Sequence, residues 1–438
     1  MNPLYRNDRQ GELPKSWYAA STELPPERSA LRGQLTVDVC IIGAGYTGLS
    51  AARVLAERGL EVIVLDAHRV GFGASGRNGG QVGSGHNTDQ RNLSRKLGKE
   101  HAAALWALSQ EAKADIRANC RNHIPEAQYK SGIAHGLYSA SEADDYRREV
   151  DFLAQNYGYD QTKMLSPDDM REIVKSPLYQ GGALDEGAGH IHPLRYALGL
   201  ARIAEAAGAR IFERSEVHHI AKGDPAEIRT DKGRVKARHV IIAGNGYLPN
   251  IERKVAAKVM PLNSFICATE PLGDLATKIL ARDIAVEDSK FVVNYFRLSE
   301  DGRLLFGGRP SYALGFPDDM TTLLQTRMCA LFPQLKDAKI DYAWGGTLGV
   351  TTTRMPAVMR IGPNIIAAGG YSGHGVALAG MAGKVMAEAV AGQAGRFDTL
   401  ADLKIPNFPG GTALRAPLLA LAMTWYLSLI HISEPTRR

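Results

Sequence analysis

Three glycines with a fixed spacing, Gly43, Gly45 and Gly48, follow an apolar run near the start of this 438-residue chain. The run from Val37 to Ile42 predicts a buried strand, and the pattern after the glycines predicts a helix. In such a unit the first glycine permits a tight turn. The second lets the backbone approach a pyrophosphate, and the third lets the helix pack on the strand. The free N–H groups of the helix then face the phosphates, so these residues predict dinucleotide binding.

A carboxylate follows at the spacing that this chemistry needs. A second apolar run, Leu60 to Leu65, predicts a strand that leads into Asp66, about 20 residues after the glycines. At this place a carboxylate accepts hydrogen bonds from a ribose diol. A glycine-rich turn of an unrelated fold would not need this acid, so its spacing favours the dinucleotide site.

Two further glycine-rich segments have the composition of ligand-binding loops. Residues 71–81 read GFGASGRNGGQ, and residues 369–375 read GGYSGHG. So many glycines indicate a backbone pressed against a flat or anionic ligand, although a flexible surface loop has the same composition. The second segment opens a predicted helix at Val376, whose N-terminal N–H groups could stabilise negative charge. His374 lies in this loop, where a histidine that only bonds to backbone is an equally good interpretation.

The elements that position these loops are spread along the chain. A strand–helix–strand pattern covers residues 36–66, a strand over 234–242 runs into Ala243-Gly244, and a strand and helix cover 365–390. Other elements are inserted between them, which predicts two interleaved domains. The expected bounds are 1–95, 185–250 and 340–405 for a discontinuous cofactor domain, 96–184 and 251–339 for a discontinuous second domain, and 406–426 for a C-terminal segment.

Residues 427–438 are expected to be a non-native tail. They resemble one reading frame of a transposase adapter used in DNA library preparation. We leave them out of the fold prediction.

The composition excludes several classes of function. The net charge of +6 is spread along the chain without a basic–aromatic run, which argues against a nucleic-acid partner. The four cysteines are far apart and form no CxxC, so neither a disulfide framework nor a metal site is expected. The apolar stretch 416–430 is shorter than the roughly 20 residues of a membrane span. With a polar N-terminus, this predicts a cytoplasmic protein without a transmembrane segment.

The order of the motifs resembles a superfamily of FAD-dependent enzymes. It comprises the D-amino-acid oxidases, glycine oxidases and sarcosine oxidases. The motifs are GAGYTG with LDA, GASGRNGGQ, VIIAGNGY and GYSGHG, at residues 43–48, 65–67, 73–81, 240–247 and 370–375. Three more segments, at residues 16–21, 189–194 and 295–308, resemble the gamma-glutamylputrescine oxidoreductase branch. The similarity spans about residues 14–425.

The resemblance implies a mixed α/β fold. A GR2-type, Rossmann-like FAD-binding domain would be interleaved with a substrate domain built on a large mixed β-sheet. The residues that carry over are Gly43, Gly45, Gly48 and Asp66 for the ADP portion, Ala74, Ser75, Asn78, Gly79, Gly80 and Gln81 for the ribityl chain and flavin, Gly244 for the nucleotide side, and Gly373, His374 and Gly375 for the pyrimidine edge.

The chain departs from the sarcosine oxidases where they hold a substrate carboxylate. Their last loop reads GHGFK, whereas this chain has Val376 and Ala377 after Gly375, so the lysine is absent. Their early loop has an arginine where this chain has Gly80. Both losses favour an amine whose charged end lies farther from the flavin. Residues 342–350 contain no flavin-linking cysteine, so non-covalent FAD is expected.

The expected activity is oxidation of a carbon–nitrogen bond in a primary or secondary amine, most simply gamma-glutamylputrescine or a related polyamine derivative. A hydride would pass to the flavin, water would hydrolyse the imine, and oxygen or another acceptor would reoxidise the cofactor. The candidate catalytic residues are Tyr295, Arg297, Trp344 and His374. Core packing of the tyrosine and tryptophan, and a surface ion pair for the arginine, are the competing interpretations.

Three alternatives to this activity stay open. The first is oxidation of an amino acid such as glycine, sarcosine, proline or a D-amino acid. The second is an NAD-dependent dehydrogenase, in which the two later glycine loops would have no role. The third is a tRNA-modifying flavoprotein, which the absence of a basic–aromatic stripe argues against.

Overall fold

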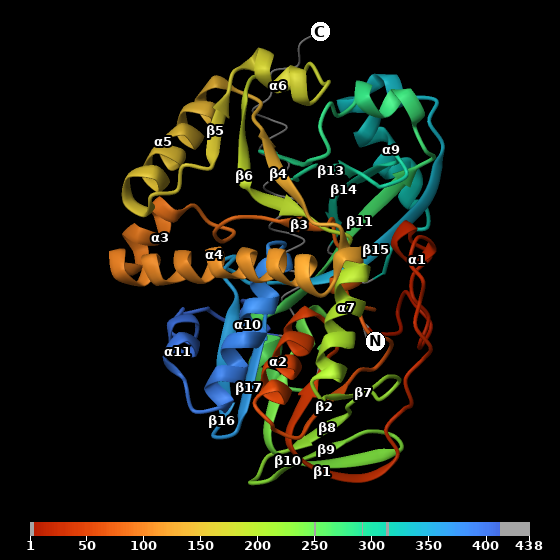
Figure 1. Ribbon diagram of the computed structural model, residues 1–438, viewed down its shortest axis with the longest axis vertical. Helices are drawn as coiled ribbons and strands as arrows, with labels where there is room; N and C mark the ends of the chain where they lie inside the picture. Colours follow the sequence, from red (N-terminus) through yellow and green to blue (C-terminus); the bar gives the residue numbers. More distant parts are fainter. Residues whose placement is uncertain (1–3, 249–250, 291, 312–314, 412–438) are drawn as a thin grey trace.

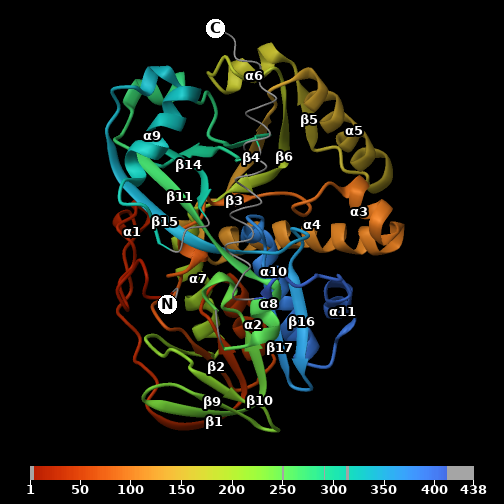
Figure 2. The ribbon, with the colours of Figure 1, turned by 180° about the vertical axis from the view of Figure 1, so that it is seen from behind.

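Two large β-sheets organise the chain, one in each half of the molecule (Figures 1 and 2). The computed structural model describes residues 4–248, 251–290, 292–311 and 315–411. The expected tail at 427–438, and the expected C-terminal segment beyond residue 411, lie outside these residues. The mixed α/β class with large mixed sheets is confirmed.

The first sheet has a parallel centre in the order β17-β10-β1-β2-β7. Parallel strands are covered on both faces, and the apolar ends of β1 and β2 are accordingly buried. β16 and β9 pair antiparallel with β17 and β10, and β8 pairs with β9. The strands are β1 (Gly33–Ile42), β2 (Val62–Leu65), β7 (Arg210–Phe212), β8 (His219–Ala221), β9 (Ala226–Arg229), β10 (Gly233–Ile242), β16 (Ala357–Gly362) and β17 (Ile365–Gly369).

The second sheet is mixed and mostly antiparallel, in the order β15-β11-β14-β13-β12-β4-β6-β3, with β5 paired to β6. Its two halves join where β12 runs parallel to β4. The strands are β3 (Gln81–Val82), β4 (Lys130–Gly136), β5 (Thr162–Leu165), β6 (Gly182–His190), β11 (Met260–Thr269), β12 (Ala285–Asp288), β13 (Tyr295–Leu298), β14 (Leu304–Ser311) and β15 (Ile340–Val350).

The helices fall into two groups. α2, α7 and α10 share one apolar core with the first sheet, and α9 packs in the core of the second. α4 crosses the molecule between the two sheets in both views (Figures 1 and 2). The helices are α1 (Trp17–Ala20), α2 (Tyr46–Glu57), α3 (Gln90–Leu97), α4 (Lys99–Asn122), α5 (Ala140–Tyr157), α6 (Pro167–Ile173), α7 (Pro193–Ala206), α8 (Arg253–Lys258), α9 (Met320–Leu331), α10 (Gly375–Val390) and α11 (Gly395–Ala401). No helix in the described ranges is long and apolar enough to cross a membrane.

Sheet and core membership differ from the expected domain bounds at several places. Residues 185–190 belong to β6 and residues 340–350 to β15, so both lie in the second sheet. The buried face of α4 lies in the core of the first sheet, although residues 96–184 were assigned to the second domain. Contacts between residues far apart in the chain determine which sheet or core these elements join. The local periodicity of the sequence does not reveal such contacts. The division into two discontinuous domains stays a prediction.

Backbone contact fixes the junction between β1 and α2. A Cβ added to Gly48 would overlap the carbonyl oxygen of Gly43, so only glycine lets the helix lie this close to the turn. A Cβ on Gly383 of α10 would similarly overlap the carbonyl oxygen of Thr47 in α2. The two helices therefore meet through main-chain atoms, which holds the turn after β1 in one position.

We expect Gly48→Ala to lower stability by about 1–3 kcal/mol, because the overlap forces α2 away from β1. Thermal unfolding followed by circular dichroism measures this as a fall of several degrees in Tm. Gly395→Ala is the matched control, since an added Cβ there meets no atom within 4 Å. An unchanged Tm for Gly48→Ala would contradict the packing argument.

Candidate active site

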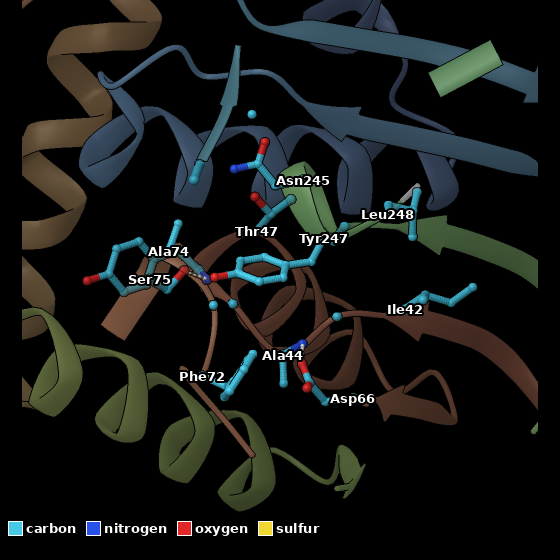
Figure 3. A pocket seen from close by; sticks show the side chains of 18 of the residues that line it. Ile42, Ala44, Thr47, Asp66, Phe72, Ala74, Ser75, Asn245, Tyr247 and Leu248 are labelled. Atoms are coloured by element: carbon cyan, nitrogen blue, oxygen red, sulfur yellow. Dashed lines mark hydrogen bonds between the residues drawn. The ribbon is translucent and has the colours of Figure 1, made fainter. Parts of the chain in front are cut away.

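A first cavity lies at the carboxyl ends of β1, β2 and β10, which is where open α/β sheets bind ligands (Figure 3). The turn after β1, the end of β2 and the end of β10 all contribute lining residues. Leu4 also lines it, and its carbonyl oxygen lies 2.9 Å from Nε2 of His68. The expected cofactor residues in the lining are Gly43, Gly45, Asp66, Ala74, Ser75, Asn78, Gly244, Gly373 and Gly375.

The turn after β1 has the tight geometry that its glycines predict. Gly43 has a φ of +108°, and an added Cβ would lie 2.8 Å from the carbonyl oxygen of Ala243, at the end of β10. A Cβ on Gly45 would lie 2.8 Å from Oγ of Ser75. The same Oγ accepts a hydrogen bond of 3.0 Å from the backbone N–H of Tyr46. The glycine loop around Ser75 is thereby attached to the N-terminus of α2.

Asp66 is held at the edge of this cavity by backbone donors. Its Oδ2 accepts from the N–H of Ala44 at 2.7 Å, and its Oδ1 accepts from the N–H of His68 at 2.8 Å. Burial raises the pKa of the carboxyl to about 6, and the two backbone bonds oppose this rise. A carboxylate has about four lone-pair sites, so two remain for a ribose diol.

A second cavity, of about 710 Å³, continues from the first. The two share lining residues from both glycine-rich loops, among them Ala74, Asn78 and Gly373. A ligand can therefore extend from one cavity into the other. The second cavity is also lined by Gly79, Gln81, His374 and Tyr295 among the expected site residues.

A family model described as "FAD dependent oxidoreductase" matches residues 38–389. The chain belongs to this family. It is 41% identical to a probable oxidoreductase OrdL of Rhizobium meliloti over 94% of this chain and 96% of the relative. It is 40% identical to the gamma-glutamylputrescine oxidoreductase of Escherichia coli over 95% of this chain and 98% of the relative. The glycine oxidase of Geobacillus kaustophilus shares the fold, with a TM-score of 0.69 and 22% identity over 82% of this chain and 95% of that structure.

This flavoprotein is thus an FAD-dependent oxidoreductase. Its two connected cavities fit an extended FAD, with Asp66 and the first turn for the adenosine half. No Cβ fits at Gly43 or Gly45, so the turn offers only main-chain atoms to a ligand, as a pyrophosphate site requires. The ring would lie in the second cavity, between the loop around Gly79 and the start of α10. The individual contacts stay a prediction.

Four expected site residues line neither cavity. Gly48 supports the helix junction, and Gly80 has a φ of +81° that lets its loop turn beside Ile191. Arg297 is buried, and it donates to the carbonyl oxygens of Gly79 at 2.9 Å and Ile191 at 3.1 Å.

Trp344 is also buried, and its Nε1 donates to the carbonyl oxygen of Arg77 at 3.0 Å. Arg297 and Trp344 therefore hold the backbone of the glycine-rich loop 71–81 in position without lining either cavity. Neither the surface ion pair nor a direct contact of Arg297 with substrate matches this geometry. The expected core packing of Trp344 matches this geometry.

His374 and Tyr295, in contrast, line the second cavity. Burial lowers the pKa of His374, while the charge of Glu287 and the Ser84 backbone oppose this, so the ring is neutral at pH 7. Its Nε2 is buried and has no hydrogen-bond partner. Burial raises the pKa of Tyr295 to about 12, and its hydroxyl lies 3.3 Å from Oγ of Ser264. Both groups are neutral and can form hydrogen bonds with a ligand.

Sequence reasoning missed one wall of the second cavity. It is formed by the segment Gly83–Gln90 and by side chains of α4, α5, β4, β6 and β12. No local motif marks these residues, because they come together only through the tertiary fold. Five carboxylate side chains lie in the lining: Asp89, Glu149, Asp185, Glu287 and Asp288.

We expect Asp66→Ala to raise the Kd for FAD about tenfold or more, because hydrogen bonds to a charged group are lost. Titration of the apoprotein with FAD, followed by flavin fluorescence, measures the Kd. The matched control is Asp144→Ala, which removes an exposed carboxylate that lines neither cavity. Equal affinities for the two variants would show that Asp66 does not contact the cofactor.

Proposed function

We propose that this flavoprotein oxidises the carbon–nitrogen bond of an amine, with gamma-glutamylputrescine or a closely related polyamine derivative as substrate. The observation that carries the proposal is the carboxylate-rich second cavity beside the glycine loops. A wall with this excess of carboxylates favours a cationic ligand over an anionic one. The named relative from Escherichia coli, matched over nearly its whole length, supports the same substrate class.

Neutral donors satisfy Asp288, so this carboxylate supports a negative potential in the cavity, whereas Glu149 is paired with Arg91 at 3.0 Å. Asp288 accepts from the hydroxyl of Tyr138 at 2.7 Å and from the side-chain amide of Asn294 at 2.6 Å, and both donors are neutral. Glu287 pairs with His135, whose Nδ1 lies 3.0 Å from Oε1. A cationic amine in this cavity therefore finds hydrogen-bond acceptors in its wall.

Bound FAD supplies the redox chemistry by accepting a hydride equivalent from the carbon next to nitrogen. The chain orients the amine and excludes water. The amine has to lose its proton before the transfer, and neutral His374 offers a free lone pair to an N–H of the bound amine. Water then adds to the released imine, giving an aldehyde and ammonia or a smaller amine.

Because Arg297 lines neither cavity, another cation has to bind a carboxylate at the far end of the substrate. Arg354 fits this role, because it lines the second cavity and is exposed to solvent. It stands in the turn after β15, where Thr351 donates its N–H to Oγ of Ser372 in the last loop. In the sarcosine oxidases the cation is the lysine of the GHGFK loop. In this chain Arg354, in the turn next to that loop, would take its place.

We also propose that FAD is bound non-covalently. None of Cys40, Cys120, Cys267 and Cys329, the four cysteines of the chain, lines either cavity. Acid precipitation should therefore release all of the flavin into the supernatant, and flavin that stays with the pellet would contradict the proposal. The same four thiols are free, and a cytoplasmic location stays a prediction.

Anaerobic absorbance spectra test the substrate. We expect gamma-glutamylputrescine to bleach the flavin band, and glycine, sarcosine and proline to leave it unchanged. Bleaching by one of the amino acids would overturn the substrate and keep the enzyme class. Air is then admitted, and release of hydrogen peroxide assigns oxygen as acceptor; its absence assigns another carrier.

We expect Arg354→Gln to raise KM for gamma-glutamylputrescine about two- to fivefold with kcat unchanged, since an exposed ion pair contributes up to about 1 kcal/mol. Steady-state kinetics at low salt measures both constants. Arg253→Gln removes an exposed arginine that lines neither cavity, and serves as the control. A fall in kcat without a change in KM would exclude the anchoring role.

A further inference from the structure

Buried polar atoms without a partner gather on the second cavity. Within the described residues, several buried side-chain polar atoms have no hydrogen-bond partner. Four of them belong to residues that line this cavity: Arg77, His86, Gln90 and His374. Buried polar groups in proteins nearly always have partners, so this grouping indicates ligand groups that complete the bonds. His86 and Gln90 form a part of the wall that the proposed reaction does not use.

His86 presents a hydrogen-bond acceptor. Its Nε2 lies 3.1 Å from the carbonyl oxygen of Leu105, and only a protonated nitrogen can bond to a carbonyl. Burial lowers the pKa of the ring to about 4, so the imidazole is neutral at pH 7. The other nitrogen, Nδ1, therefore carries a lone pair, and it is the atom without a partner.

Gln90 presents a second acceptor. Its Nε2 donates to the carbonyl oxygen of Ala102 at 2.6 Å and to the hydroxyl of Tyr157 at 3.1 Å. These bonds fix the orientation of the amide and leave Oε1 as the unpartnered atom. The residue is 2% exposed, so bulk water does not satisfy this oxygen.

The neighbours of the two acceptors suit a cation. Glu149 lines the cavity and accepts from the backbone N–H of Gln90 at 2.6 Å, and its second oxygen pairs with Arg91 at 3.0 Å. Trp106 is a further lining residue, and an indole face attracts cations. A primary ammonium has three N–H donors and no acceptor, which complements two lone pairs beside a carboxylate and an indole.

Gln90 and Trp106 lie away from Tyr295 at the reacting end, whereas Asn87, next to His86, donates its side-chain amide to the carbonyl oxygen of Ser372 in the last loop. Gln90 begins α3, and Trp106 belongs to α4. Tyr295, beside the flavin loop, belongs to β13, which pairs with β14. Figures 1 and 2 both show α3 on the opposite side of the molecule from β14. A ligand that reaches both ends of the cavity is therefore elongated.

We propose that His86 Nδ1 and Gln90 Oε1 bind a primary ammonium of the substrate that is separate from the reacting nitrogen. The enzyme thus selects bifunctional amines that carry a second cationic group at the far end. This inference rests on the proposed function for the position of the reacting end. The binding subsite itself can be tested without turnover.

The test uses two ligands without a reactive amine, the gamma-glutamyl and the glutaryl amides of butylamine. They differ only in the α-ammonium group. Calorimetric titration of the FAD-loaded enzyme should give at least about tenfold tighter binding for the gamma-glutamyl compound, as expected for a charge-assisted hydrogen bond. Because neither ligand is oxidised, failure of the proposed amine oxidation leaves this result readable.

Gln90→Met removes the acceptor and keeps the size of the side chain. We expect the ratio of the two Kd values to fall to about one in this variant. The ratio should stay unchanged in Gln110→Met, whose glutamine lies on α4 outside both cavities. His86→Phe serves as a second variant if Gln90→Met does not fold. Equal binding of both ligands to the wild-type enzyme, or a ratio that survives both substitutions, would overturn the proposal.

Discussion

Main-chain contact around the turn after β1 is the constraint on which the rest of this structure depends. Three backbone segments meet there: the Gly43 turn, the end of β10 at Ala243 and the α2 backbone that α10 approaches at Gly383. No side chain separates them, so small shifts in any one move the others. The same contacts set where α10 begins, and with it the loop that carries His374. The first cavity and the histidine of the second are therefore fixed by one set of glycines.

Behind the flavin loop, buried side chains hold main-chain carbonyls in place. Arg297 joins Gly79, Ile191 and the hydroxyl of Tyr18, and thereby connects β13 to the loop, to the end of β6 and to α1. Hydrogen bonds from a charged donor are stronger than neutral ones, which suits a loop made largely of glycine. Arg297 thus fixes the position of the glycine loop although its side chain lines neither cavity.

The sequence predicted the parts of the site that are local. The unit from β1 to β2 follows from apolar periodicity and glycine spacing, and α10 and β10 were placed within one residue. The strand β3 was missed, because two residues have no period and their pairing partner, β6, lies far along the chain. The helix α3 was not predicted.

The wall of the second cavity could not be predicted for the same reason. Its residues come from the segment Gly83–Gln90, from two helices and from three strands of the second sheet, and each of those elements has only an ordinary amphipathic pattern. Arg297 stood in a recognisable motif, yet the motif could not tell whether its side chain points into the cavity or behind the loop.

The N-terminal residues have a consequence for how long the cofactor stays bound. Leu4 lines the first cavity, its carbonyl pairs with His68, and Asp8 pairs with Arg77 at 3.1 Å. Tyr5 adds a hydrogen bond to Glu216, another lining residue. A nucleotide bound in the first cavity would lie against Leu4 of this segment. Opening of residues 4–8 would then be one of the steps that set the dissociation rate of FAD, and a change in this segment would alter exchange kinetics while leaving every residue of the glycine loops untouched.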